Sequence, residues 1–278
     1  MVSNFILNFT PTGMIPTREM TPHVPLAPHE IVQQVLEAVD LGANMIHLHA
    51  RDPDTGIPTY KKDIYAEIIE GIRKKHKDVI IGVSTSGRHF TEFEKRAEVL
   101  DLKGQLKPDF ASLTLSSLNF NKQASINSPE MIIRLVEKMR HCGIRPEFEA
   151  FDLGMINYAK YLARKQYVSP PYYFNLILGN IACAQANLLT LGLMEKEVPE
   201  QSIWSAGGIG NSQLKVNLMA LLAGGGVRIG LEDNIWYDER RTKLATNAML
   251  IQRIREIAKS LGLTPYEPGD ARRVLGLI

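Results

Sequence analysis

Short apolar runs alternate with longer segments of helical periodicity along nearly the whole chain. The runs that predict strands are Phe5–Phe9, Met45–Leu48, Val79–Val83, Phe110–Leu115, Glu147–Phe151, Tyr173–Leu178, Ile203–Ala206 and Val227–Ile229. The segments that predict helices lie near 28–41, 63–76, 91–101, 129–142, 154–165, 181–194, 212–223 and 240–261. Such alternation favours a closed parallel sheet, the TIM (β/α)8 barrel of the α/β class, over an open doubly wound sheet.

Length agrees with a single barrel, and charge and cysteine content limit the possible partners and disulfide bonds. The 278 residues are close to the roughly 250 of a typical barrel, so we expect one domain spanning residues 1–278. A net charge of +2 gives no reason to expect nucleic acid or a membrane surface as a partner. No apolar run reaches the roughly 18 residues of a membrane span and no signal peptide is recognisable, so we expect a cytoplasmic protein. Cys142 and Cys183 are too few for a disulfide framework and are expected to be buried free thiols.

Two segments between the predicted elements are longer than ordinary loops. Residues 11–28 contain five prolines, and residues 116–128 are polar. Both follow the C-terminal ends of strands, which is the side where barrels place their active sites. They are surface excursions or, equally well, lids and pocket walls.

A pair of histidines carries the sharpest chemical signal. His47 and His49 lie two residues apart on a predicted strand, so their side chains point to the same side. Two imidazoles at the end of a barrel strand can share one divalent ion, most often zinc. The alternative is a pair of hydrogen-bonded core residues. The placement before a loop favours the metal.

A catalytic zinc usually has three protein ligands and one open position, so a third ligand is needed. No histidine follows residue 141. The last predicted strand runs into Glu232, which would share one face with Arg228 if the period of two continued beyond the strand. We therefore predict a site made of His47, His49 and Glu232, against the alternative that Glu232 lies in a solvated acidic turn.

Polar residues gather at other strand ends as well. Several such ends on one rim predict a pocket. The polar residues at these strand ends are Ser84 on the third strand, Ser112 and Thr114 on the fourth, and Glu147 and Glu149 on the fifth. The seventh strand is followed by the glycine-rich turn Gly207–Gly210. That turn either binds an anion or only reverses the chain.

Taken together, five motifs resemble the β-keto acid cleavage enzyme family, in order and over nearly the whole chain. The motifs are Pro11-Thr-Gly13, His47-Leu-His49-Ala-Arg-Asp52, Ser84-Thr-Ser-Gly87, Glu147-Phe-Glu-Ala-Phe-Asp152 and Arg228-Ile-Gly-Leu-Glu-Asp233. The resemblance implies a (β/α)8 barrel with a divalent metal, usually zinc, in a homotetramer. It also implies the reaction of a β-keto acid with acetyl-CoA, which yields acetoacetate and a new acyl-CoA.

The resemblance also implies roles for individual residues. His47, His49 and Glu232 would be the metal ligands. Arg228 and Asp233 would bind and deprotonate the keto acid, and Ser84 and Thr114 would hydrogen-bond it. The family has an acidic residue on the fifth strand, for which Glu147 and Glu149 both qualify; Glu149 is favoured as nearer the rim. The helix ending at Gly262 or the tail Thr264–Ile278 would help to bury a subunit interface.

One position departs from the family member that acts on 3-keto-5-aminohexanoate. That enzyme has an acidic residue after the Pro-Thr-Gly-like turn, where it pairs with the substrate ammonium, and this chain has Met14 instead. An ammonium buried there without a partner would cost several kcal/mol. We therefore expect a neutral, aliphatic keto acid as the substrate.

Three other functions compete with this interpretation. A metal-dependent hydrolase of the amidohydrolase type also uses a His-x-His barrel strand, but on the first strand and with further histidines from middle strands. A zinc-dependent aldolase-like lyase or isomerase of sugar phosphates is the second. A structural zinc protein is the third, although closed structural sites are usually rich in cysteine and neither cysteine is near the histidine pair.

Overall fold

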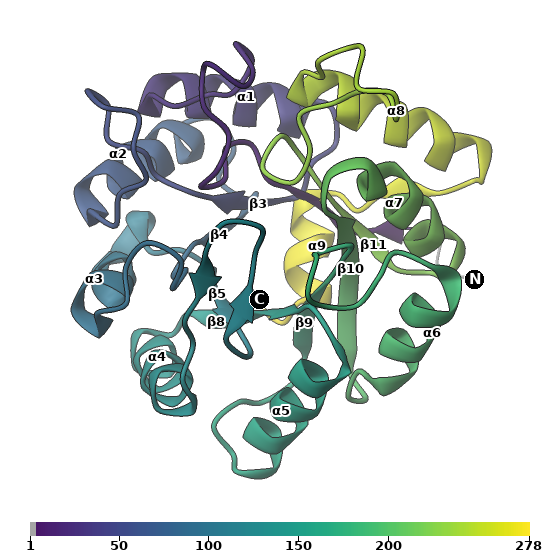
Figure 1. The fold of residues 1–278 in the computed structure, drawn as a ribbon. Helices are drawn as coiled ribbons and strands as arrows, with labels where there is room; N and C mark the ends of the chain where they lie inside the picture. The colour runs from purple at the N-terminus through teal and green to yellow at the C-terminus, as the bar shows by residue number, and fades with distance from the viewer. Residues whose placement is uncertain (1–3) are drawn as a thin grey trace.

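The computed structural model describes residues 4–278, and its centre is a closed barrel of eight parallel strands. Around the barrel the strand order is β10-β11-β2-β3-β4-β5-β8-β9, and helices surround it (Figure 1). The barrel strands are β2 (Leu7–Phe9), β3 (Met45–Leu48), β4 (Ile80–Val83), β5 (Phe110–Thr114), β8 (Arg145–Ala150), β9 (Tyr172–Leu178), β10 (Ser202–Gly208) and β11 (Gly226–Ile229). The predicted fold class is therefore confirmed.

The helices follow the strands in the predicted alternation. They are α1 (Pro28–Asp40), α2 (Lys62–Arg73), α3 (Phe93–Ala97), α4 (Pro129–Cys142), α5 (Leu153–Arg164), α6 (Leu188–Glu197), α7 (Gln213–Leu222) and α8 (Asn247–Ser260), with 3-10 turns η1 (Glu98–Asp101), η2 (Gly104–Leu106) and η3 (Gly210–Ser212). Helix α4 shows why the boundaries fall where they do. The Ser128 hydroxyl accepts a hydrogen bond from the Met131 amide, and Gly143 ends the helix with a φ of 63°.

Two helices begin later than the sequence predicts. The prediction places the sixth helix near 181–194, but residues 179–186 form turns, and α6 begins only after Asn187, whose side chain accepts from the Thr190 amide. The eighth was predicted to start near 240. Instead, Asp238 accepts hydrogen bonds from the amides of Thr242 and Lys243 in a loop, and α8 starts after the Thr246 cap. In both places side-chain acceptors stabilise turns that a helical pattern does not reveal.

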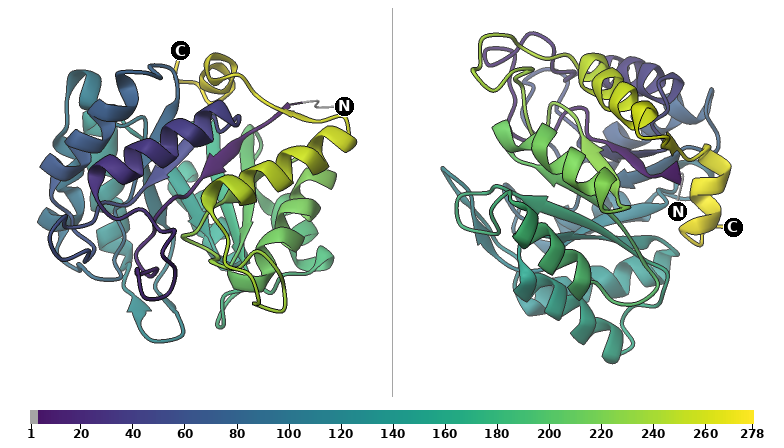
Figure 2. Two further views of the ribbon diagram at one scale, coloured as in Figure 1. Left: turned by 90° about the horizontal axis from the view of Figure 1, so that it is seen from above. Right: turned by 90° about the vertical axis from the view of Figure 1, so that its right-hand side faces the viewer.

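The two ends of the barrel differ in character. Residues 10–27 and the hairpin formed by β6 (Leu118–Asn119) and β7 (Ala124–Ser125) project from the end where the strands terminate, and α9 (Pro268–Val274) lies at the other end (Figure 2, left). A short sheet of β1 (Asn4–Phe5) and β12 (Thr264–Pro265) lies outside the barrel. The two long loops are thus on the side predicted for the active site.

The barrel interior is apolar at the α9 end and polar above it. The apolar layer packs against α9 and contains Met45, Ile80, Phe110 and Tyr173 from the strands, Ile6 from the link between β1 and β2, and Ala271 and Leu275 from the C-terminal segment. The opposite faces of the same strands pack against the surrounding helices. This arrangement closes one end of the barrel and leaves the chemistry to the other.

Two smaller observations complete the fold. Cys142 and Cys183 are free, as predicted, but each is partly exposed where a buried thiol was expected. Among the helices of residues 4–278, none combines the length and apolarity that a membrane crossing requires.

Candidate metal centre and active site

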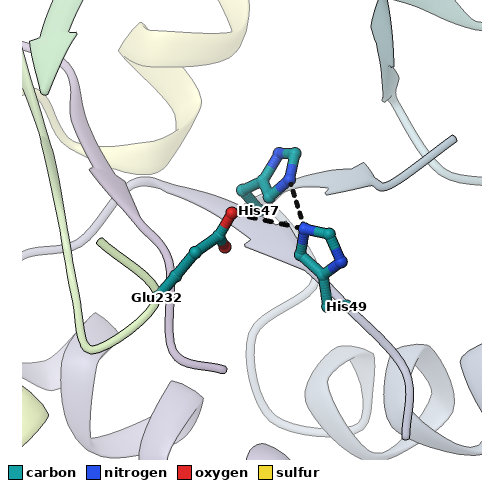
Figure 3. A group of neighbouring side chains, drawn as sticks. All are labelled: His47, His49 and Glu232. Carbon is teal, nitrogen blue, oxygen red and sulfur yellow. Dashed lines mark hydrogen bonds and ion pairs between the residues drawn. The ribbon is translucent and has the colours of Figure 1, made fainter. Parts of the chain in front are cut away.

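Strand β3 directs both histidines into the barrel. His47 and His49 are almost fully buried, and the Nε2 atom of one ring lies 3.2 Å from the Nε2 atom of the other. The intervening Leu48 faces the helices instead, as the alternation of a strand requires. The side chains predicted to face together do so, and their nitrogens point at the same position (Figure 3).

Glu232 joins the two histidines from the turn that follows β11, the last barrel strand along the chain. Its Oε1 atom lies 3.3 Å from His49 Nε2, and the ligand atoms of the three residues all lie within 4.8 Å of one another. The route differs from the expected one, because β11 ends at Ile229 and Glu232 lies in the turn that follows it. That turn is held to the residue that directly follows β2, since the Glu232 amide donates to the Thr10 carbonyl over 3.2 Å.

Gly13 of the Pro-Thr-Gly turn makes room for this carboxylate. A Cβ atom at position 13 would lie 2.5 Å from Glu232 Cγ, which is closer than two carbon atoms approach. Gly13 also has a φ of 64°, which L residues adopt only with strain. The turn motif therefore serves the site by letting the backbone pass directly beneath the third candidate ligand.

Glu147 orients His47 from behind. Its Oε2 atom accepts from His47 Nδ1 over 2.7 Å, and Oε1 accepts from the side-chain amides of Asn8, over 2.8 Å, and Asn175. All four side chains are buried. A hydrogen on Nδ1 leaves the lone pair of Nε2 free toward His49 and Glu232, which is the tautomer that a metal ligand needs.

The donor set fits a divalent metal ion. Burial lowers the pKa of His47, but the carboxylates of Glu147 and Glu232 raise it, to about 9 in total. This negative charge favours a cation between the rings, which is either a second proton on His47 or a metal ion. The Oε2 atom of Glu232 is buried without a hydrogen-bond partner in residues 4–278, so this oxygen is available to bind a metal ion. Two imidazole nitrogens and one carboxylate are a typical catalytic zinc set.

Arg228 gathers three acidic residues beside this centre. Its Nε atom donates to Asp233 Oδ2 over 3.0 Å, and Nη2 donates to Glu232 Oε1 over 2.7 Å. Nη1 lies 3.6 Å from Glu149 Oε1, is buried, and has no hydrogen-bond partner in the described part of the chain. Burial would lower the pKa of Arg228, but the three carboxylates raise it above its ordinary value. Nη1 is thus a buried donor on a charged group, without an acceptor among residues 4–278.

Asp233 is nearly buried and differs from Glu232 in its electrostatics. Burial and the neighbouring Glu232 raise the pKa of Asp233, against the opposing charge of Arg228. For Glu232, the two histidines and Arg228 outweigh burial and bring the pKa well below its usual range. A carboxylate whose pKa is raised is the better proton acceptor of the two. The backbone carbonyl of Asp233 also accepts from the Gly210 amide over 2.7 Å, so the glycine-rich turn braces this residue.

The remaining predicted residues lie around the same centre. Thr114 donates to Glu149 Oε2 over 2.7 Å at the rim of the barrel. Ser84 and Met14 line one pocket together with His49. The two acids of the fifth barrel strand therefore belong to different parts of the site: Glu147 contacts the histidine pair, and Glu149 contacts Thr114 and faces Arg228.

Sequence reasoning missed the side chains that hold Glu147. Asn8 and Asn175 each stand at an inward position of a strand whose outward neighbours are apolar. A polar residue in the middle of an apolar run is a signal that could have found them, since a buried amide needs a partner. Their partner, Glu147, comes from β8, which neighbours β9 but does not pair with β2, so the contact with Asn8 crosses the barrel interior.

Comparison with known proteins identifies the family. A family model described as beta-keto acid cleavage enzyme matches residues 4–277. The chain belongs to the β-keto acid cleavage enzyme family. The 3-keto-5-aminohexanoate cleavage enzyme of Fusobacterium nucleatum is 33% identical over 100% of this chain and 99% of its own. The 3-oxoadipate:acetyl-CoA acetyltransferase of Cupriavidus necator is 31% identical over 100% of this chain and 96% of its own. The predictions of this family and of an enzyme are confirmed.

A solved structure supports the barrel independently. The ternary complex of ObcA with a C4-CoA adduct and oxalate has a TM-score of 0.80 to this chain and 22% sequence identity, and the match covers 92% of this chain and 68% of ObcA. The likeness concerns the fold. Family membership disfavours the amidohydrolase, sugar-phosphate and structural-zinc alternatives.

Proposed function

We propose that this chain transfers an acyl group from a β-keto acid to CoA, using acetyl-CoA and releasing acetoacetate. The observation that carries the proposal is the convergence of His47, His49 and Glu232 beside the Arg228–Asp233 pair, in a chain of the β-keto acid cleavage family. The names of its relatives, which include an acetyl-CoA acetyltransferase, support acetyl-CoA as the co-substrate.

His47, His49 and Glu232 would hold the metal, for which zinc is the first candidate. Such an ion, when bound, would act as a Lewis acid toward the ketone and carboxylate oxygens of the keto acid. Glu147 fixes the orientation of His47 through the 2.7 Å hydrogen bond to Nδ1.

Asp233 and Arg228 would perform the proton transfer. Asp233, with its raised pKa, removes a proton from C2 of the keto acid. The free Nη1 of Arg228 donates to the substrate carboxylate, because its other two nitrogens already bind Asp233 and Glu232. Thr114 and Ser84 would hydrogen-bond the substrate. Glu149 would either return the proton to C2 or keep the Thr114 hydroxyl in place through their hydrogen bond.

The carbon chemistry balances without a covalent enzyme intermediate. The C2 carbanion attacks the carbonyl carbon of acetyl-CoA, and the CoA thiolate leaves. The thiolate then attacks the ketone carbon of the condensed product, and the bond between that carbon and C2 breaks. The proton taken from C2 returns to C2, which gives acetoacetate and the new acyl-CoA. No Ser–His or Cys–His nucleophile is required, in agreement with the side chains of the site.

We further propose that 3-keto-5-aminohexanoate is a poor substrate. Met14 lines the pocket beside His49 and Ser84, and the lining of that pocket contains no acidic residue but does contain Lys95 and Arg96. An ammonium there would be desolvated without a counter-ion and near two cations. The uncharged Met14 wall agrees with the neutral keto acid predicted from the sequence.

A homotetramer in the cytoplasm stays a prediction. Its structural support is the exposed apolar face of α6, where Leu188 and Leu189 are each 73% exposed. The tail is a weaker candidate for the interface, because its Ala271 and Leu275 are already buried against the barrel.

The direct test is an acetoacetate assay. Purified protein, loaded with zinc, is incubated with acetyl-CoA and a panel of β-keto acids with neutral, cationic and anionic side chains. We expect acetoacetate from at least one keto acid, loss of activity in His47→Ala, and normal activity in His141→Ala, a histidine that lies outside the site. Acetoacetate production by His47→Ala at the wild-type rate would contradict the proposal.

A further inference from the structure

The side chain of Arg88 is a cation that makes no ion pair and no hydrogen bond among residues 4–278. It lies in the loop between β4 and α3, and its Nε atom is buried without a hydrogen-bond partner. Its guanidinium carbon lies 3.5 Å from the centre of the Phe120 ring, which belongs to the β6–β7 hairpin. One face of the guanidinium is therefore covered by an aromatic ring, and its edge is left free to bind.

Two neighbouring arginines show what a structural role looks like here. Arg51 donates to the carbonyls of Gly13, Gly56 and Pro16 through its three nitrogens. Arg96 likewise donates to Thr85, Ile126 and Asn127, again with all three nitrogens used. Arg88 differs from both because its side chain makes no such bond. Two arginines of these loops, Arg51 and Arg96, thus stabilise the backbone through their hydrogen bonds, whereas the guanidinium of Arg88 does not.

The backbone fixes the position of Arg88. The Arg88 amide donates to Ser86 Oγ over 3.3 Å, and the amide of Ile126 donates to the Gly87 carbonyl over 3.2 Å. A Cβ atom at position 87 would lie 2.3 Å from the Ile126 carbonyl oxygen, so only glycine permits this close approach. The loop after β4 and the hairpin are therefore joined just where Arg88 begins, and its side chain is held at the mouth of the barrel.

Arg88 also lies close to the candidate active site, because Ser86, two residues before it, lines the pocket that contains His49 and Ser84. Burial lowers the pKa of Arg88, while the charges of Glu232, Glu149 and Asp233 raise it. These acids contact Arg228 rather than Arg88. The site therefore has two arginines of different kinds: Arg228 is surrounded by carboxylates, and Arg88 has no ion-pair partner among the residues that the structure describes.

We propose that Arg88 binds a carboxylate at the far end of the keto acid, so that the preferred substrate is a β-keto dicarboxylic acid. This inference rests on the proposed function, in which Arg228 takes the carboxylate at the reacting end. It replaces the neutral side chain predicted from Met14 alone, because an uncharged wall tolerates a neutral and an anionic group alike, whereas an unpaired arginine attracts the anion.

The anion belongs to the keto acid rather than to CoA. The phosphates of CoA are separated from the thioester by the whole pantetheine arm. When the thioester lies at the metal centre, the phosphates lie well outside the site. Arg88 belongs to the loop after β4, whose Ser84 and Ser86 line the pocket that also contains His49. The far carboxylate of a short dicarboxylic acid needs only a few methylene groups to reach it.

The test compares a matched pair of substrates. 3-Oxoadipate and 3-oxohexanoate have chains of the same length and differ by a carboxylate in place of a methyl group at the far end. We expect wild-type kcat/KM to be higher for 3-oxoadipate, and Arg88→Gln to lower the ratio of the two values by about 10- to 100-fold, as the loss of a charge-assisted hydrogen bond implies. Arg88→Lys keeps the charge and should restore part of the ratio.

Arg253→Gln is the matched control. Arg253 also stacks on an aromatic ring, that of Tyr237, and also has a buried Nε atom without a partner, but none of the site acids acts on it. It should leave the substrate ratio at the wild-type value.

Three outcomes would overturn the inference. They are a wild-type preference for 3-oxohexanoate, an Arg88→Gln variant with an unchanged ratio, and an Arg88→Gln variant whose main defect is a raised KM for acetyl-CoA. Failure of the proposed function looks different, since neither substrate would then give acetoacetate with the wild-type enzyme.

Discussion

Replacing Glu147 by Gln tests how the barrel interior supports the metal site. Glu147 accepts hydrogen bonds from His47 Nδ1, Asn8 and Asn175, and all of these groups are buried. Glutamine has nearly the same shape but only one acceptor oxygen, and its amide is a donor. Whichever way the amide turns, at least one of the three donors faces another donor.

The magnitude follows from these contacts. A buried donor left without an acceptor costs about 1–3 kcal/mol in the free energy of unfolding. If the amide group faces His47, Nδ1 loses its acceptor, and the tautomer with the Nε2 lone pair is no longer favoured. Changes of this kind behind a metal-bound histidine typically weaken metal affinity by about 10- to 100-fold. We expect Glu147→Gln to fall within both ranges.

The assay is a zinc titration of metal-free protein against a competing chelator, with circular dichroism to verify the fold. Glu149→Gln is the control, because it changes the same residue type two positions along β8 without contacting His47. Its zinc affinity should stay within about threefold of wild type, well below the roughly 10- to 100-fold loss expected when a group that hydrogen-bonds a metal ligand is changed. A Glu147→Gln protein that binds zinc as tightly as wild type would refute the reasoning.

The same titration has an expected pH dependence. In the metal-free protein the pKa of His47 is raised to about 9, so zinc must displace a proton from this residue at lower pH. The apparent zinc affinity should rise by up to about tenfold per pH unit from pH 7 toward 9 and then level off. The raised pKa also stabilises the metal-free fold, fully below the unfolded value near 6.5 and progressively less as the pH rises through about 9. Glu147→Gln removes one cause of the raised pKa and should flatten both profiles.

Four further outcomes are expected. The double variant His47→Ala/His49→Ala should lose bound zinc and activity while keeping the barrel, and full metal occupancy in metal analysis would contradict it. Asp233→Asn should bind zinc and substrate but lose about 10²- to 10⁴-fold in kcat, and turnover within threefold of wild type would place the base elsewhere, with Glu149 next in line. Met14→Glu should raise kcat/KM for 3-keto-5-aminohexanoate relative to uncharged and anionic keto acids, and an unchanged ratio would show that the residue at position 14 does not contact the far end of the substrate. Leu188→Glu should lower the mass measured by light scattering, and a wild-type monomer at micromolar concentration would rule out the tetramer.

Much of the fold follows from local patterns. Every barrel strand coincides with an apolar run, because the strands of a closed parallel barrel are buried on both faces. The errors at α6 and α8 arise where Asn187 and Asp238 hydrogen-bond to nearby amides. Those bonds stabilise a cap or a turn in segments whose hydrophobic period looks helical, and periodicity alone does not distinguish the two.

The site was predictable to the extent that it depends on single strands. His47 and His49 needed only the period of two. Glu232 was selected by a period that does not reach it, since it lies in the turn after β11, and that turn still brings it to the histidine pair. The choice between Glu147 and Glu149 depended on which layer of the barrel each occupies. That is set by the register between strands, in which Thr114 pairs with Glu149. The position of Arg88 could not be predicted from the sequence, because the ring on which it stacks, Phe120, belongs to a separate hairpin.

The fate of the acetyl group tests the central claim most directly. Zinc-loaded enzyme is supplied with acetyl-CoA carrying ¹³C in both acetyl carbons and an unlabelled β-keto acid, and the products are read by NMR. If Asp233 generates the C2 carbanion and this carbanion attacks the thioester, C3 and C4 of acetoacetate carry the label, C1 and C2 do not, and the new acyl-CoA is unlabelled in its acyl group. Label that stays in acetyl-CoA while the keto acid is consumed, or label in the new acyl-CoA, would contradict the account.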